Sequence, residues 1–239
     1  MSEELVIRGL PDGKTMLELC GGGEQLSHVV IRPMTLRYAA AVVRAVYIGG
    51  VETREAWRGR GFARRLITAA LDRERAGDAA VALLYGIGDF YHRFGYATLG
   101  AEHGLALRHP EQGAVLPAGW RVRAAREDDL PAIRRLYDAE AVSAVMRKVR
   151  QPDDPAWAQL AALLRGEREG DACRVVQGPD GNVVAYAWLG RGCWTVDHAQ
   201  ERYWPQDLFI GEAVAAGHAA ADAVLAACRM WGGGGGRAA

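Results

Sequence analysis

This chain of 239 residues has a formal net charge of zero, only four cysteines and no long apolar run. Its 29 basic and 29 acidic side chains balance. This disfavours a general binder of nucleic acid or anionic membranes, because such proteins are usually basic. No apolar run approaches the ~20 residues of a membrane span, and the start Met-Ser-Glu-Glu lacks the basic residues of a signal peptide. We therefore expect a cytoplasmic protein with neither nucleic acid nor membrane as partner.

The four cysteines are scattered along the chain, without a C-x-x-C pair and without histidine at ligand spacing. Free thiols in a reducing compartment are the expected state, rather than disulfides or a bound metal. Half of the residues are apolar, which is enough for one large domain or two small ones.

The N-terminal part predicts β structure followed by one helix. Apolar residues spaced three and four apart predict the helix over 61–76, which Gly77 ends. Paired glycines at 49 and 50 indicate a bulge, or close approach of a ligand, within a long strand. The strands are expected at 16–20 and 26–31 (a hairpin), 41–53, 79–85 and 97–108, with one or two helical turns at 90–94; residues 1–14 supply at most one strand.

After a Pro- and Gly-containing linker at 110–119, the pattern restarts with a strand at 120–124. Residues 126–131 carry a helix-start signal. The further elements expected are helices through residues 130–137 and over 152–164, a hairpin of strands 173–177 and 183–189, a strand at 209–213 and a helix at 219–230. The Gly-rich tail at 232–239 has nothing to bury and is expected to be disordered.

The segment from Val51 to Leu66 runs from an apolar strand through a basic, glycine-containing turn into a helix. Free backbone N–H groups at a helix N-terminus, with glycines that allow close approach, are suited to bind a diphosphate. Arg58, Arg60 and Arg64 add positive charge there. The alternative is an ordinary turn with solvated arginines. A Rossmann site is excluded, because the third glycine and the acidic residue after the next strand are both missing.

Two motifs resemble the GNAT acetyltransferase superfamily. Arg58-x-x-Gly61-x-Ala63, after a strand and opening a helix, is similar to the family's Arg/Gln-x-x-Gly-x-Gly/Ala signature. The segment Phe90-Tyr91-His92-Arg93-Phe94-Gly95-Tyr96 is similar to the segment that closes the family's acetyl-CoA site. The amino-acid sequence around residues 27–33 and 87–96 looks closest to that of the tandem GNAT proteins of the enhanced-intracellular-survival type.

The resemblance implies an α/β fold of the α+β kind, with mixed sheets in two tandem GNAT-like domains. The first, residues 1–109, would bind acetyl-CoA but lack the helices that normally open the fold. After the linker 110–119, residues 120–231 would form a degenerate second domain without the Arg/Gln-x-x-Gly motif, followed by the tail 232–239.

The implied activity is direct transfer of an acetyl group from acetyl-CoA to a primary amine, on a small molecule such as an aminoglycoside or on lysine, without a metal. The catalytic groups would be the Val51 N–H, which binds the thioester oxygen, and the Tyr91 hydroxyl, which protonates the departing thiolate. The co-substrate-binding residues would be Val51, Glu52, Thr53, Arg58, Gly59, Arg60, Gly61, Phe62, Ala63, Arg64 and Tyr91.

Several alternatives stay open at this point. Tyr91 could be a core aromatic, and the chain could be a non-catalytic acyl-CoA-binding or assembly protein. Formation of a homo-oligomer is neither required nor excluded.

His28 is interpreted as a structural histidine. Candidates for a general base, acting directly or through water, are Glu52, Glu55, His92, Glu102 and His103, and the alternative for each carboxylate is a solvated surface group. The aromatic residues Trp188, Trp194, Tyr203 and Trp204 are expected to pack in the second domain.

Overall fold

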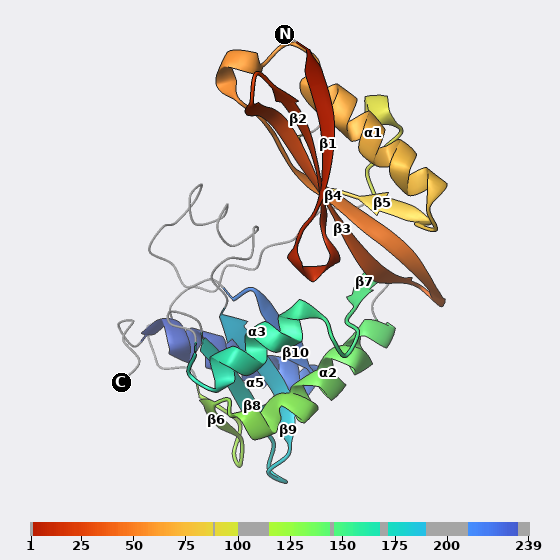
Figure 1. Cartoon of the computed structure of the whole chain (residues 1–239). Coiled ribbons are helices and arrows are strands. Elements are labelled where there is room, and N and C mark those ends of the chain that lie inside the picture. Colours follow the sequence, from red (N-terminus) through yellow and green to blue (C-terminus); the bar gives the residue numbers. More distant parts are fainter. Residues whose placement is uncertain are drawn as a thin grey trace. The chain divides into compact units, whose positions relative to one another are not determined.

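The computed structural model describes residues 2–87, 89–99, 115–143, 146–167, 172–189 and 210–233. The chain divides into two compact units, residues 1–102 with 145–149, and residues 103–144 with 150–239. Figure 1 shows that each unit has its own sheet and its own helices. One sheet is mixed and the other antiparallel, so the predicted mixed α/β fold is confirmed.

The sheet of the first unit follows the chain order β1-β2-β3-β4-β5. Neighbouring strands are antiparallel, except for the parallel pair of β4 and β5. The predicted hairpin is confirmed as β2 and β3, and the long strand as β4. The bounds are β1 Glu3–Gly9, β2 Thr15–Gly21, β3 Glu24–Tyr38, β4 Ala41–Thr53 and β5 Val81–Leu83, with a 3-10 turn, η1 (Pro11–Gly13), joining β1 to β2.

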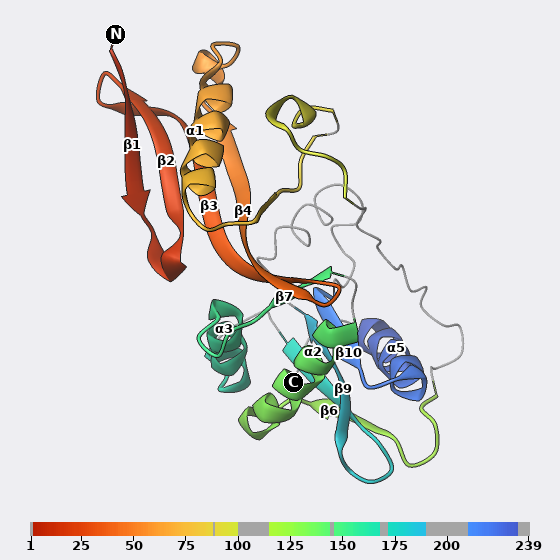
Figure 2. The same ribbon diagram turned by 90° about the vertical axis from the view of Figure 1, so that its right-hand side faces the viewer.

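Helix α1 (Phe62–Ala76) covers one face of this sheet, as the spacing of its apolar residues predicts (Figure 2). Phe62, Leu66 and Ala70 are buried against a cluster from β2, β3 and β4 that includes Leu17 and Val29. Burying a side chain of this size contributes about 1.5–3 kcal/mol. The cluster therefore fixes α1, and with it the turn that precedes α1, against β4.

A further strand of this sheet, β7 (Met146–Val149), was not expected from the sequence. The sequence placed these residues in the second domain, but they pair with residues 35–38 of β3 and belong to the first unit. The reason is that β3 runs past the expected end at Ile31, whereas β2 pairs with β3 only as far as Ile31. The edge of β3 beyond Pro33 is therefore available to β7.

Two expected strands differ from the structure. Strand β5 covers 81–83 rather than 79–85, and residues 84–87 adopt no regular structure. Of the expected closing strand 97–108, residues 97–99 are not in a strand and the rest lie outside the described residues. The short helix is present as the 3-10 turn η3 (His92–Phe94).

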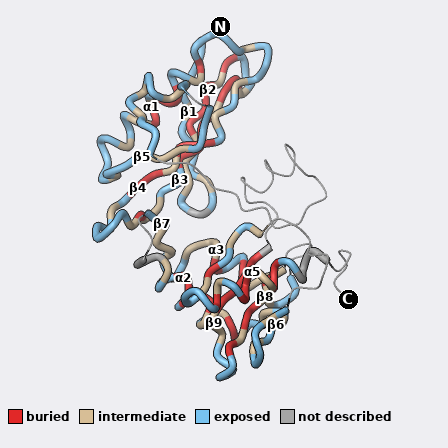
Figure 3. Tube along the Cα trace, turned by 180° about the vertical axis from the view of Figure 1, so that it is seen from behind, coloured by how far each residue is buried: buried red, intermediate tan, exposed pale blue. Residues whose placement is uncertain are grey.

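The second unit contains an antiparallel sheet in the order β10-β9-β8-β6. Helices α2 and α3 pack on one face and α5 on the other. Figure 3 shows buried stretches in both the strands and the helices of this unit. The bounds are β6 Arg121–Ala124, α2 Leu130–Ser143, α3 Pro155–Leu164, β8 Ala172–Gln177, β9 Val183–Leu189, β10 Glu212–Ala215 and α5 His218–Gly233. The predicted hairpin and helices are confirmed, whereas the last strand begins later than the expected 209–213. Trp194, Tyr203, Trp204 and the end of the Gly-rich tail lie outside the described residues.

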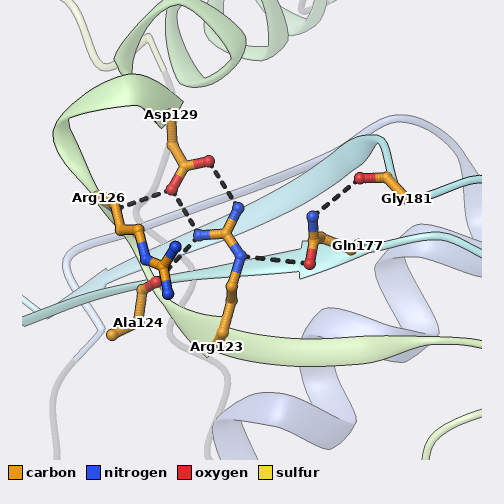
Figure 4. Close-up of polar contacts among 6 residues, drawn as sticks. All are labelled: Arg123, Ala124, Arg126, Asp129, Gln177 and Gly181. Carbon is orange, nitrogen blue, oxygen red and sulfur yellow. Dashed lines mark hydrogen bonds and ion pairs between the residues drawn. The ribbon is translucent and has the colours of Figure 1, made fainter.

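An ion pair fixes the entry to α2 (Figure 4). Arg123 donates to both carboxylate oxygens of Asp129, over 2.6 and 2.8 Å, and the Arg126 N–H donates to the same carboxylate over 2.7 Å. These contacts hold the pKa of Asp129 below its usual value, chiefly through the Arg123 hydrogen bond. Arg123 also donates to Gln177, whose amide donates to the Gly181 carbonyl in the β8–β9 turn.

A second, more buried ion pair joins Arg150, which precedes α3, to Glu212 at the start of β10. Arg150 donates to both carboxylate oxygens of Glu212, over 3.0 and 2.6 Å, and the Tyr186 hydroxyl donates to the same carboxylate over 2.7 Å. The guanidinium also lies over the Tyr137 and Trp157 rings, 4.1 and 4.9 Å from their centroids. These contacts offset the free-energy cost of removing the charges of Arg150 and Glu212 from water.

Candidate active site

Strand β4 is bulged at the glycine pair. His28 pairs with Glu52 and Val30 with Gly49, so Gly50 and Val51 lie opposite the single residue Val29. Gly50 has φ +58°, a conformation that glycine adopts without strain. The predicted bulge is confirmed. It shifts the pairing register between β3 and the end of β4 by one residue.

Beyond the bulge, β4 has a free edge. Strand β5 pairs with β4 only from Ala45 to Tyr47, and in the described part of the chain no strand pairs with residues 48–53 on that side. An unpaired strand edge offers backbone N–H and C=O groups to an extended ligand, as in β-augmentation.

The turn between β4 and α1 presents backbone N–H groups. Gly59 and Gly61 have φ +76° and +79°. The first helical hydrogen bond of α1 is from the Arg65 N–H to the Gly61 carbonyl, at 3.0 Å. The N–H groups of residues 62–64 therefore have no acceptor in the helix. They carry the positive end of the helix dipole and can bind an anion.

A groove of about 990 Å³ joins the free edge to this turn, entirely within the first unit. It is lined by nine of the predicted co-substrate-binding residues: Val51, Glu52, Thr53, Arg58, Gly59, Gly61, Phe62, Ala63 and Arg64. Two predicted residues are not among its lining residues. Arg60 lies over the Trp57 ring, 4.5 Å from the centroid. The Tyr91 ring contacts those of Phe90 and Phe94, which do line the groove.

Tyr91 is half-buried in an aromatic cluster with Phe90, Phe94 and Tyr96. Its ring fills the space in which any side chain at residue 86 would lie, so Gly86 is required for this packing. Burial, and secondarily the nearby Tyr47, raises the pKa of Tyr91 above its ordinary 10.0. The hydroxyl therefore stays protonated at neutral pH and can donate a proton.

A smaller hollow of about 380 Å³ shares Arg64, Arg93 and Phe94 with the groove. Its α1 residues, Arg64, Thr68, Leu71 and Arg75, are spaced four and three apart and lie on one helix face. No acidic side chain lines this hollow. Arg75 and Arg93 are not part of the predicted site, although the helical spacing from Arg64 indicates Arg75.

The candidate bases are placed differently. Glu52 and Glu55 line the groove. His92 does not, and its ring lies near Thr98 and Asp89 instead; Glu102 and His103 lie outside the described residues. His28, which the sequence suggested to be structural, lines the groove.

Among the residues that the structure describes, no group of three His, Cys, Asp or Glu side chains could hold a metal ion. No helix in the same residues is long and apolar enough to cross a membrane.

Comparison with known proteins agrees with this geometry. The family model described as an acetyltransferase (GNAT) domain matches residues 6–99. No curated protein matches the sequence. A probable N-acyltransferase of unknown function from Enterococcus faecalis V583 has a similar structure, with a TM-score of 0.63, 14% identity and coverage of 92% of this chain and 53% of its own.

A GCN5-related N-acetyltransferase from Kribbella flavida is also similar, with a TM-score of 0.56, 16% identity and coverage of 91% of this chain and 51% of its own. The chain thus spans about half the length of these two proteins. At such identities the likeness concerns the fold alone. The family match covers less than half of the chain and shows that residues 6–99 are similar to an acetyltransferase (GNAT) domain.

Proposed function

We propose that the protein transfers an acetyl group from acetyl-CoA directly to a primary amine. The observation that carries this proposal is the open groove that unites the free edge of β4 with the unpaired N–H groups before and within the first turn of α1. A GNAT domain takes its acyl group from an acyl-CoA, and this groove offers one surface to the extended arm and another to the diphosphate.

Each part of the co-substrate has a place in this proposal. The diphosphate binds to the N–H groups of residues 59–64, with Arg58 and Arg64 beside it. The pantetheine arm pairs with the edge of β4 at residues 51–53, and the Val51 N–H binds the thioester oxygen. The 3′-phosphate enters the hollow lined by Arg64, Arg75 and Arg93. Tyr91 protonates the thiolate.

The acceptor is a small-molecule amine, such as an aminoglycoside, or a lysine. We also propose that the protein acts in the cytoplasm and that the two units are tandem GNAT-like domains of the enhanced-intracellular-survival type, divided near residues 110–119. In support, the second unit repeats the order of strands followed by a helix, and α5 begins after Gly217 without an arginine-bearing turn. The second unit would therefore not bind CoA.

An assay of thiol release separates this proposal from its alternative, a non-catalytic acyl-CoA-binding protein. The protein is incubated with acetyl-CoA and a panel of amines: cadaverine, an Nα-blocked lysine amide and an aminoglycoside. The proposal predicts amine-dependent release of CoA and formation of the N-acetyl product, detected by mass spectrometry. CoA binding in calorimetry, with no product from any of these amines, would favour the binding protein.

Replacing Tyr91 by phenylalanine should lower kcat while leaving the affinity for CoA nearly unchanged. Loss of a general acid typically costs about 10²–10⁴-fold in rate, and the phenyl ring keeps the packing against Gly86. Because the pKa of Tyr91 is raised, any loss of wild-type activity through its ionisation should occur above pH 10.0. Equal kcat values for the two proteins in steady-state assays would assign Tyr91 to packing alone.

A further inference from the structure

Three charged or titratable residues form a row across the sheet. Glu18 of β2 pairs with His28 of β3, and His28 pairs with Glu52 of β4. Directly paired residues in antiparallel strands point to the same face of a sheet, with Cβ atoms about 4.5–5.5 Å apart. Their chain neighbours Leu19 and Ser27 are buried on the α1 side. The row therefore lies on the face opposite α1.

The first member of the row is already neutralised. Glu18 is only 6% exposed, and its carboxylate accepts hydrogen bonds from Arg8 on β1 and Gln25 on β3. A buried carboxylate with two such donors is a structural group. It leaves Glu52 as the carboxylate without a partner that faces His28.

The side chains of His28 and Glu52 have no hydrogen-bonding or ionic partner among the described residues, and both residues line the groove. His28 is half-buried, whereas Glu52 is exposed. The Ser27 hydroxyl donates to the Glu52 carbonyl over 2.7 Å and lies 2.8 Å from the Thr53 hydroxyl. These contacts fix the two strands against each other where His28 and Glu52 pair.

His28 and Glu52 lie where the acceptor amine can approach the thioester. Val51 and Thr53 point to the α1 side, because successive side chains of a strand alternate between faces. Val51 packs against the core cluster there, and Thr53 contacts the buried Ser27 hydroxyl. The groove reaches both faces around the free edge of β4. An acceptor can therefore approach the thioester from the face of His28, opposite the co-substrate.

We propose that His28 is the general base of the acetyl transfer, and that Glu52 is a positioning residue that favours the imidazolium formed on His28. This inference rests on the proposed function. A ring nitrogen of His28 first takes a proton from the ammonium group of the acceptor. The neutral amine nitrogen then bonds to the thioester carbonyl carbon, and it loses its second proton to water as the amide forms. The C–S bond breaks, and the thiolate takes the proton of Tyr91. His28 then releases a proton to water, and Tyr91 recovers one from water.

The same arrangement defines the class of acceptor. Glu52 and Glu55 both line the groove, and their carboxylates attract a cation, whereas the arginines lie at the α1 end. The acceptor is therefore a cationic primary amine that reaches the groove on the face opposite α1.

The test compares three substitutions by kcat/KM as a function of pH, with CoA affinity measured by calorimetry. His28→Gln should lower kcat/KM by about 100-fold with little change in CoA affinity, and it should remove the acidic limb of the pH profile. Glu52→Gln should lower kcat but keep that limb. His218→Gln is the matched control, because His218 lies exposed at the start of α5 in the second unit, and it should behave as the wild type.

His28→Ala supplies a second readout, because added imidazole should restore part of its activity if the lost group is a base. An acidic limb that persists in His28→Gln, or no effect of imidazole on His28→Ala, would overturn this inference while leaving the transferase proposal intact. A wild-type protein that binds CoA but acetylates none of the amines would overturn both.

Discussion

The Gly61→Asp protein should lose CoA binding, whereas the Gly61→Asn protein should retain most of it. Both side chains have the same size, and both tolerate the left-handed conformation that Gly61 adopts at φ +79°. Apart from its two chain neighbours, no residue has an atom within 4 Å of a Cβ built at Gly61, so the new side chain points into open space beside the first turn of α1. The two variants differ only in charge.

A carboxylate about 4 Å from a diphosphate charge costs about 4 kcal/mol at the effective dielectric of a protein surface. This corresponds to a Kd about 10³-fold higher. Isothermal titration of the two variants with CoA measures the difference, and circular dichroism checks that both are folded. Equal affinities for CoA would show that the anion does not bind at this turn.

The largest expected effect on stability is in the second unit. Arg150→Ala should lower the free energy of unfolding of this unit by about 3–5 kcal/mol, because it leaves the Glu212 carboxylate buried without its cation. It also removes the guanidinium from the faces of Tyr137 and Trp157. The change can be followed in urea by tryptophan fluorescence, because Trp157 is buried in the same core cluster.

Arg165→Ala is the matched control for this prediction. Arg165 also pairs with a carboxylate through two hydrogen bonds, to Glu167, but this pair is exposed. Exposed pairs contribute little to stability because water screens them. Equal urea midpoints for the Arg150 and Arg165 variants would mean that the buried pair contributes no more than a surface pair.

The elements that sequence analysis predicted are those whose pattern is local. The spacing of Phe62, Leu66 and Ala70 alone defines the buried face of α1, and the glycines before β3 define the hairpin turn. The bulge could be predicted from Gly49 and Gly50, because paired glycines inside an apolar strand have few other uses. The glycine turn before α1 could be predicted for the same reason.

The elements that sequence analysis missed depend on pairing between distant segments. Met146–Val149 has only four residues, in which apolar and polar side chains hardly alternate. It forms a strand because it pairs with the part of β3 that extends beyond β2. The apolar neighbours of His28 in the sequence favour a structural role for it. Its position opposite Glu52 follows from the register of β3 and β4 across the bulge, and register is set by tertiary packing.

The binding account can be tested most directly by the amide resonances of the ¹⁵N-labelled protein during titration with CoA, dephospho-CoA and pantetheine. We expect CoA and dephospho-CoA to shift the amides of residues 59–64, and all three to shift those of 51–53. CoA alone should also shift the side-chain signals of Arg75 and Arg93. Saturating CoA that leaves the amides of 59–64 unmoved would contradict the account.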